Sequence, residues 1–171
     1  MTTIAVVVGN PKPASRTLAV ATAVADALAS AVAADQDHLV VDLAEYAASL
    51  FDWAAPELSR ITAEVAAADL AVFASPTYKA SYTGMLKAFL DRYGPDGLAG
   101  TVAVPVMTGG SAGHSLAVEV HLRPVLIELG AVVPARGLYV TEPEFGDLPA
   151  VVSRWGGTGL PLVKAALGSQ A

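Results

Sequence analysis

The sequence predicts an α/β fold in which helices cover both faces of one doubly wound parallel sheet. Five short apolar runs alternate along the chain with segments whose apolar residues recur at helical spacing. Parallel strands need a crossover connection of a dozen or more residues, and the helical segments supply it. A length of 171 residues is that of one ordinary domain, so we expect residues 1–171 to form a single unit.

The expected strands are short runs rich in β-branched and apolar residues. They cover residues 4–8, 39–43, 70–74, 101–107 and 137–140. Pro105 falls inside the fourth run and lacks the N–H that a sheet ladder uses. We therefore expect it near the end of its strand or at a bulge.

The expected helices follow the apolar periodicity between these runs. We expect the fourth helix to break or kink at Pro124, because a proline inside a helix removes a hydrogen bond. We expect the fifth helix to be interrupted by its glycines. The helices cover residues 18–32, 57–67, 85–93, 115–129 and 148–167.

Composition excludes several classes of protein. Hydrophobic residues make up 54% of the chain and charged residues 15%, which excludes intrinsic disorder. A net charge of −6 argues against nucleic-acid binding through a broad basic face. The lack of cysteine excludes disulfides, zinc fingers, iron–sulfur sites and thiol catalysis. No uncharged apolar run reaches the ~18 residues of a membrane span, so we expect a soluble, cytoplasmic protein without membrane association.

Ligands of open parallel sheets bind beyond the carboxyl ends of the strands, so the loops there are candidate sites. Residues 9–17 combine the hydroxyls of Ser15 and Thr17 with the charges of Lys12 and Arg16, directly before a helix. Free N–H groups and the helix dipole favour a phosphate at that position. The loop lacks the glycines of a dinucleotide fingerprint or a Walker loop, so a mononucleotide phosphate fits it better. A plain helix N-cap at Ser15 is an equally good interpretation.

Two further loops fit a flat ligand. Residues 74–84 place Tyr78 among small residues, and residues 108–113 contain Gly109 and Gly110, which let a ring lie close to the backbone. A surface turn at a subunit interface and a flexible connector are the simpler interpretations of these two loops. Taken with the phosphate loop, however, they provide what flavin mononucleotide (FMN) requires.

With these loops the sequence resembles the NADPH-dependent FMN reductases, and within them the flavin reductases of sulfonate-utilising two-component systems. The resemblance is carried by GNPKPASRT at 9–17, ASPTYKASYTGMLKAFLD at 74–91 and TVAVPVMTGGSAGHSLAVEVHLRPVLIELGA at 101–131. It implies a flavodoxin-like three-layer sandwich whose five parallel strands have the order 2-1-3-4-5.

The resemblance also implies which residues contact FMN. Ser15, Arg16 and Thr17 would hold the phosphate, and the two later loops would line the flavin. Lys12 stands where the family often has arginine, and a point charge in place of a fork implies looser phosphate geometry. The implied cofactor-binding residues are Asn10, Pro11, Lys12, Ser15, Arg16, Thr17, Pro76, Thr77, Tyr78, Lys79, Ala80, Ser81, Thr108, Gly109, Gly110 and Ser111.

The implied activity is NAD(P)H-dependent reduction of FMN, by hydride transfer from nicotinamide C4 to flavin N5, to supply a partner monooxygenase. One alternative keeps FMN fixed and reduces quinones, azo dyes or metal oxyanions. A less favoured alternative is a flavodoxin-type electron carrier. Electron carriers usually have a more acidic flavin-side surface, whereas four basic residues surround these loops. They are Lys12, Arg16, Lys79 and Lys87.

The cofactor carries the chemistry in such an enzyme, so we expect no catalytic side chain and no metal. His114 is more readily interpreted as a helix cap than as an acid or base. Asp42, Glu45 and Asp52 are interpreted as solvated carboxylates. The sequence does not distinguish NADPH from NADH.

The sequence further predicts a homodimer or homotetramer. One short helix carries more apolar surface than a monomer readily covers, and the resemblance implies the same assembly. Val120 and His121 stand where close relatives can carry an aromatic insertion that alters helix packing and flavin release. The apolar residues of the short helix are Tyr82, Met85, Leu86, Phe89 and Leu90.

Overall fold

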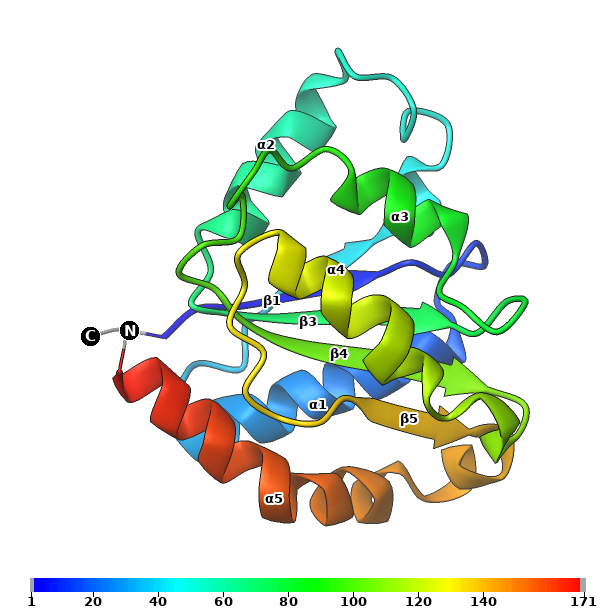
Figure 1. Cartoon of the computed structure of the whole chain (residues 1–171), viewed down its shortest axis with the longest axis vertical. Helices are drawn as coiled ribbons and strands as arrows, with labels where there is room; N and C mark the ends of the chain where they lie inside the picture. The colour runs from blue at the N-terminus through cyan, green and yellow to red at the C-terminus, as the bar shows by residue number, and fades with distance from the viewer. Residues whose placement is uncertain (1, 170–171) are drawn as a thin grey trace.

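A computed structural model describes residues 2–169 and shows a parallel sheet between two layers of helices (Figure 1). Within those residues the sheet has five strands in the order β2-β1-β3-β4-β5, and every neighbouring pair is parallel. The predicted fold class and strand order are therefore confirmed. The strands are β1 (Ile4–Val8), β2 (Leu39–Asp42), β3 (Leu70–Pro76), β4 (Val102–Gly109) and β5 (Leu138–Thr141).

Helices cover both faces of this sheet, and each helical layer shares its own apolar core with the strands. On one face, α1 (Arg16–Val32) and α5 (Leu148–Gly168) pack against each other. The other face is covered by α2 (Pro56–Ala66), α3 (Gly84–Leu90) and α4 (Arg123–Glu128) (Figure 1).

Strand residues alternate between the two cores, because successive side chains of a strand point to opposite faces. In β1, Ile4, Val6 and Val8 pack under α1 and α5, whereas Ala5 and Val7 belong to the core on the other face. A sheet that is covered on both sides needs apolar residues at every position. This is why continuous apolar runs mark the strands in the sequence.

Pro105 lies in the middle of β4, so the prediction of a strand end or a bulge is wrong. The register with β3 is continuous across it. Val102 donates its N–H toward β3, and Ala103 donates toward Val132 on the opposite side. Position 105 shares the direction of Ala103, but β5 pairs with β4 only from Val106 onward. No strand therefore lies beside Pro105 to accept a backbone N–H, and the missing N–H of the proline costs no hydrogen bond of the sheet.

The segment after β4 is not one helix kinked at Pro124. A 3₁₀ turn (Ala112–His114) leads to a π-helical turn (Val118–Leu122), and α4 begins only at Arg123. The N–H of Arg123 donates five residues back, to the carbonyl of Val118. Pro124 lies in the first turn of α4, where a helix uses no N–H from it. The predicted break exists, but it precedes the proline and has π geometry.

α5 is continuous from Leu148 to Gly168, so the predicted interruption by glycines is wrong. Gly159 lies against the indole of Trp155, whose Cε2 would be 2.8 Å from a Cβ at that glycine. Trp155 is buried and donates its Nε1–H to the carbonyl of Arg136 at 2.8 Å. The glycine thus makes room for the tryptophan that ties α5 to the segment before β5.

The apolar face of α3 is buried in the chain's own core. Leu86, Phe89 and Leu90 are at most 1% exposed, and Tyr82 and Met85 are partly buried against the same core. These residues therefore do not need a second subunit to cover them. The expectation that this helix leaves apolar surface for a second subunit is wrong, because its apolar side chains pack against the chain's own sheet.

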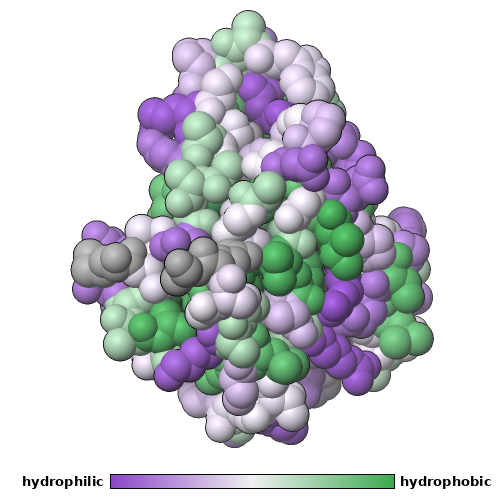
Figure 2. All heavy atoms as spheres, turned by 60° about the vertical axis from the view of Figure 1, so that its left-hand side comes forward, coloured by the Kyte–Doolittle hydropathy of each residue, from purple (hydrophilic) through white to green (hydrophobic). Residues whose placement is uncertain are grey.

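The face that holds the beginnings of the strands carries hydrophobic residues in small groups, separated by hydrophilic ones (Figure 2). Among residues 2–169, no helix has both the length and the apolarity to cross a bilayer. The opposite edge, where the parallel strands end, is where open sheets of this class bind ligands.

Gly9 follows β1 at the point where α3 crosses the end of the strand. A Cβ at this position would overlap the Cβ of Leu86 and lie 3.0 Å from its Cα. We expect Gly9→Ala to lower the free energy of unfolding by about 1–3 kcal/mol, because backbone atoms would have to move apart. Urea unfolding followed by circular dichroism measures this change.

Gly157→Ala is the matched control. Gly157 is exposed inside α5, and a Cβ there would meet no atom within 4 Å. Alanine should raise the free energy of unfolding by about 0.5–1 kcal/mol, since it favours the helix. Equal unfolding midpoints for the two variants would contradict the close approach at Gly9.

Candidate functional site

A cavity of about 370 Å³ lies at the carboxyl ends of the strands, and its volume is in the range of small-molecule sites. Its walls come from the loop after β1 with the start of α1, the ends of β3 and β4, and a 3₁₀ turn (Glu142–Asp147) after β5. The lining residues are Asn10, Lys12, Ala14, Ser15, Arg16, Thr17, Pro76, Thr77, Tyr78, Thr108, Gly109, Gly110, Glu142 and Phe145.

Most of the residues predicted to contact FMN meet in this cavity. Lys79 and Ala80 instead form the tip of a hairpin, and Ser111 caps the 3₁₀ turn that follows β4. The predicted residues that lie outside the lining are Pro11, Lys79, Ala80, Ser81 and Ser111.

Three lining residues were missed by sequence reasoning: Ala14, Glu142 and Phe145. The last two belong to the 3₁₀ turn after β5. A signal for them exists, because the loop after the fifth strand also lies at the carboxyl edge of the sheet. That loop has no glycine pair or hydroxyl run to draw attention to it.

The start of α1 offers free hydrogen-bond donors to the cavity. Ser15 is the N-cap, and its Oγ accepts the N–H of Leu18 at 3.2 Å. Across residues 2–169, the N–H groups of Arg16 and Thr17 have no acceptor. The cap assignment and a phosphate role for Ser15 are compatible, since a hydroxyl that accepts can still donate its own proton.

Two hydroxyls join the first and third loops on the floor of the cavity. The Oγ1 atoms of Thr17 and Thr108 lie 2.9 Å apart, and both residues are buried. Asn10 donates its Nδ2–H to the same Thr17 oxygen at 3.1 Å. These bonds fix the loop after β1 to the end of β4, so the two walls are held at one spacing.

Asp42 is buried and holds the phosphate loop, so the expectation that it is a solvated carboxylate is wrong. It is 6% exposed, and its Oδ2 accepts the N–H of Ala14 at 3.0 Å. Its Oδ1 accepts the N–H of Ala44 at 3.3 Å. Ala14 has a φ of 50°, a left-handed conformation that an alanine rarely adopts. The buried carboxylate holds the loop in that strained turn.

Arg16 crosses the mouth of the cavity. Its Nη1 lies 2.8 Å from Glu142 Oε1, and its guanidinium is 4.8 Å from the ring centre of Phe145. The Arg16 and Glu142 side chains are 65% and 57% exposed, so solvent screens their attraction. The guanidinium of Arg16 is thus already paired with Glu142, but the pairing is weak.

The second loop is a tight hairpin. Tyr78 and Ser81 exchange backbone hydrogen bonds of 2.9 and 3.1 Å, and Lys79 and Ala80 between them have φ values of 51° and 66°. Two successive left-handed residues other than glycine cost about 1–3 kcal/mol each. The N–H of Thr77 donates to Thr108 at 2.7 Å, which anchors the hairpin to β4. This strained turn holds Tyr78 at the cavity.

The two glycines of the third loop have different surroundings. A Cβ on Gly109 would collide with the hydroxyl of Tyr139 and lie 2.8 Å from its Cζ, so Gly109 is small because of that tyrosine. Gly110 also lines the cavity, and a Cβ on it would meet nothing within 4 Å, so there is open space beside this residue. His114 is exposed and does not line the cavity. In the described part of the chain, no group of three His, Asp or Glu residues could hold a metal ion.

Comparison with known proteins gives the family. The family model described as NADPH-dependent FMN reductase matches residues 2–144. An FMN reductase (NADPH) of Pseudomonas aeruginosa strain PAO1 is 33% identical over 149 residues, 84% of this chain and 78% of that protein. An FMN reductase (NADPH) of Escherichia coli K12 is 38% identical over 92 residues, which are 54% of this chain and 48% of that protein.

A solved structure is similar to this chain over a longer span. An oxidoreductase from Corynebacterium diphtheriae is 30% identical and superposes with a TM-score of 0.83, over 96% of this chain and 98% of that chain. The family match covers the loops after β1, β3 and β4 that line the cavity, as well as all five strands. The chain therefore belongs to the NADPH-dependent FMN reductase family.

Proposed function

We propose that this protein is an NAD(P)H-dependent FMN reductase that takes FMN into the cavity at the carboxyl edge. The observation that carries the proposal is the two-part wall of that cavity. One part offers free N–H groups and hydroxyls at the start of α1, and the other offers a stiff hairpin with an open glycine edge. FMN has the same two parts, a charged phosphate and a flat ring.

The donors at the start of α1 fit a phosphate. This helix has 17 residues, so its first-turn N–H groups carry the positive end of a full helix dipole. Lys12 and Arg16 add two positive charges at the same wall. In this proposal, three groups donate hydrogen bonds directly to the phosphate of FMN. They are the hydroxyl of Ser15 and the backbone N–H groups of Arg16 and Thr17.

The remaining lining fits a flat ring. Bound FMN would supply the redox chemistry, by accepting a hydride at N5 from nicotinamide C4. The chain's own task is to orient the ring between the Tyr78 hairpin and the open edge at Gly110. Among the lining residues Glu142 is the sole carboxylate, and Arg16 engages it. No side chain of the cavity is therefore assigned as a general acid or base.

We further propose that FMN is an exchangeable substrate, reduced here and released to a partner monooxygenase. The guanidinium of Arg16 already contacts Glu142 at 2.8 Å. A phosphate must therefore compete with Glu142 for it. This competition lowers the affinity that the arginine can add. A cytoplasmic location suits this role, because the reduced pyridine nucleotide that it would consume is a cellular cofactor.

The proposed homodimer or homotetramer rests on exposed apolar side chains near α4. Leu116, Val120 and Ile127 are 61%, 57% and 52% exposed. Val120 and His121 lie in the π-helical turn, which widens the helix on that side. Exposed apolar residues that form a contiguous patch mark an interaction site, and a second copy of this chain is the partner that the resemblance implies.

The phosphate assignment is tested with Arg16→Ala. The variant should lose FMN affinity by about 1.5 kcal/mol, the low end of the range for bonds to charged groups, because Arg16 is largely exposed. Riboflavin lacks the phosphate and should bind almost as before. Titration of flavin fluorescence measures both dissociation constants.

Glu142→Gln is the companion variant. It removes the competing carboxylate without changing the size of the side chain, so FMN should bind more tightly and riboflavin should not. Equal changes for FMN and riboflavin in the two variants would refute the phosphate assignment.

The exchange of FMN is tested by turnover. The purified protein should be partly or wholly colourless, and NAD(P)H oxidation should rise to saturation with added FMN. A full complement of FMN that does not exchange, with quinone reduction that needs no added flavin, would instead identify the fixed-FMN enzyme. Bound FMN with no NAD(P)H oxidation would identify an electron carrier.

The assembly is tested by sedimentation velocity at micromolar concentration. The wild-type chain should sediment as a dimer or tetramer, and Val120→Glu should shift it toward the monomer. Leu162→Glu is the control, since Leu162 is 48% exposed on α5, on the other face of the sheet. A wild-type monomer with and without FMN would contradict the proposal.

A further inference from the structure

A second hollow of about 360 Å³ lies beside β5, between that strand and α5. Two arginines, Arg136 and Arg154, line it together with Tyr139, Thr158 and Glu144. It adjoins the FMN cavity, because Tyr139 donates its hydroxyl to Ser111 O and accepts from Thr77 Oγ1, both at 3.3 Å. Thr77 lines the FMN cavity, so this tyrosine separates the two spaces.

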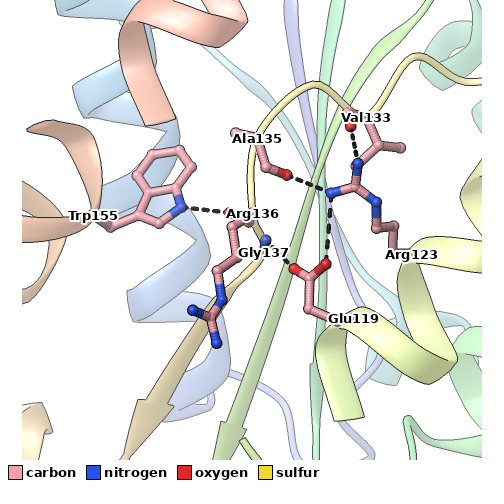
Figure 3. Close-up of polar contacts among 7 residues, drawn as sticks. All are labelled: Glu119, Arg123, Val133, Ala135, Arg136, Gly137 and Trp155. Atoms are coloured by element: carbon pink, nitrogen blue, oxygen red, sulfur yellow. Dashed lines mark hydrogen bonds and ion pairs between the residues drawn. The ribbon is translucent and has the colours of Figure 1, made fainter. Parts of the chain in front are cut away.

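The backbone around Arg136 is held from both sides. Its own carbonyl accepts the indole N–H of Trp155 at 2.8 Å, and the next N–H, of Gly137, donates to Glu119 at 2.6 Å (Figure 3). The preceding carbonyl, of Ala135, accepts from Arg123 at 2.9 Å. Three successive residues are thus fixed by side chains from α5 and from the helical segment after β4.

Gly137 makes this fixation tight. A Cβ there would lie 3.0 Å from the carbonyl oxygen of Pro105, so the segment before β5 lies directly against β4. The Cα of Arg136 therefore has a defined position, and only its side chain is free to move.

The guanidinium of Arg136 is not used by this network. It extends away from the Glu119–Arg123 pair (Figure 3), and in residues 2–169 it has no hydrogen-bond or ion-pair partner. Arg136 is exposed, and its guanidinium fork has five N–H donors that can bind an anion.

Arg154 is held beside it by Glu144. One oxygen of Glu144 accepts Arg154 Nη2 at 2.9 Å, and the other accepts the N–H and the hydroxyl of Thr141. Those two bonds from Thr141, with a smaller contribution from Arg154, hold the pKa of Glu144 below its usual range. The lining of the hollow contains two arginines and one carboxylate, so its side chains carry a net positive charge on a chain whose net charge is −6.

We propose that this hollow binds the 2′-phosphate of NADPH at its adenosine end, and so gives the protein a preference for NADPH over NADH. The inference rests on the proposed function, because that reaction brings a reduced pyridine nucleotide to the adjoining cavity. Guanidinium forks match the geometry of a phosphate and bind it with charge-assisted hydrogen bonds. NADH lacks this phosphate, so the two arginines distinguish the two nucleotides.

The test compares wild type with Arg136→Ala and Arg136→Lys. In Arg136→Ala the KM for NADPH should rise roughly tenfold while kcat and the KM for NADH stay within about twofold, since one charge-assisted contact is lost. Arg136→Lys keeps the charge and should recover part of the affinity. FMN affinity should not change, because Arg136 does not line the FMN cavity.

A binding measurement separates this inference from the proposed function. Isothermal titration with adenosine 2′-monophosphate needs neither flavin nor turnover. Wild type should bind it, Arg136→Ala should bind it roughly tenfold more weakly, and adenosine should not bind to either. Binding without any FMN reduction would refute the proposed function and leave the anion site standing.

Arg60→Ala is the matched control for charge. Arg60 is 62% exposed on α2, where it pairs with Glu64, and it lies on the other face of the sheet. It should leave both nucleotides unaffected. The inference is overturned if Arg136→Ala leaves the KM for NADPH unchanged, or if NADPH and NADH weaken by the same factor.

Discussion

The close approach of α3 to the end of β1 is the constraint on which the carboxyl edge depends. Gly9 donates its N–H to Ala74 at 2.8 Å, and its carbonyl accepts the hydroxyl of Thr83 at 2.6 Å. The same glycine has no room for a Cβ, because Leu86 lies against it. One residue thus joins the phosphate loop, the end of β3 and the start of α3. The spacing of the cavity walls follows from this junction.

The fold was predictable from the sequence where its cause is local. Buried parallel strands must be apolar throughout, so β1 and β3 stand out as runs. Pro105 and the glycines of α5 were misjudged, because their tolerance depends on neighbours far away in the sequence. β4 tolerates Pro105 because its pairing with β5 begins only at Val106. α5 tolerates Gly159 because the indole of Trp155 occupies the space beside it. Local rules cannot supply such facts.

The candidate site was predictable to the extent that it follows from topology. Loops after strands one, three and four had to meet at one edge, and their residues line one cavity. Asp42 and Glu142 were not foreseen as parts of it, since each acts through a partner on another strand's loop. A buried carboxylate under Ala14 and a paired one beside Arg16 require the folded geometry. The roles of these two carboxylates follow from their contacts in the folded chain, and no sequence motif marks them.

The bond from Asp42 to the phosphate loop links ligand binding to the order of a sheet edge. Asp42 is the last residue of β2, a four-residue strand that pairs only with β1. Short edge strands open most readily, and an opening of β2 would withdraw the carboxylate that holds Ala14 in its left-handed turn. By reciprocity, a phosphate that requires the ordered loop stabilises that edge. A phosphate bound at the start of α1 therefore reduces the fraying of the edge strand β2.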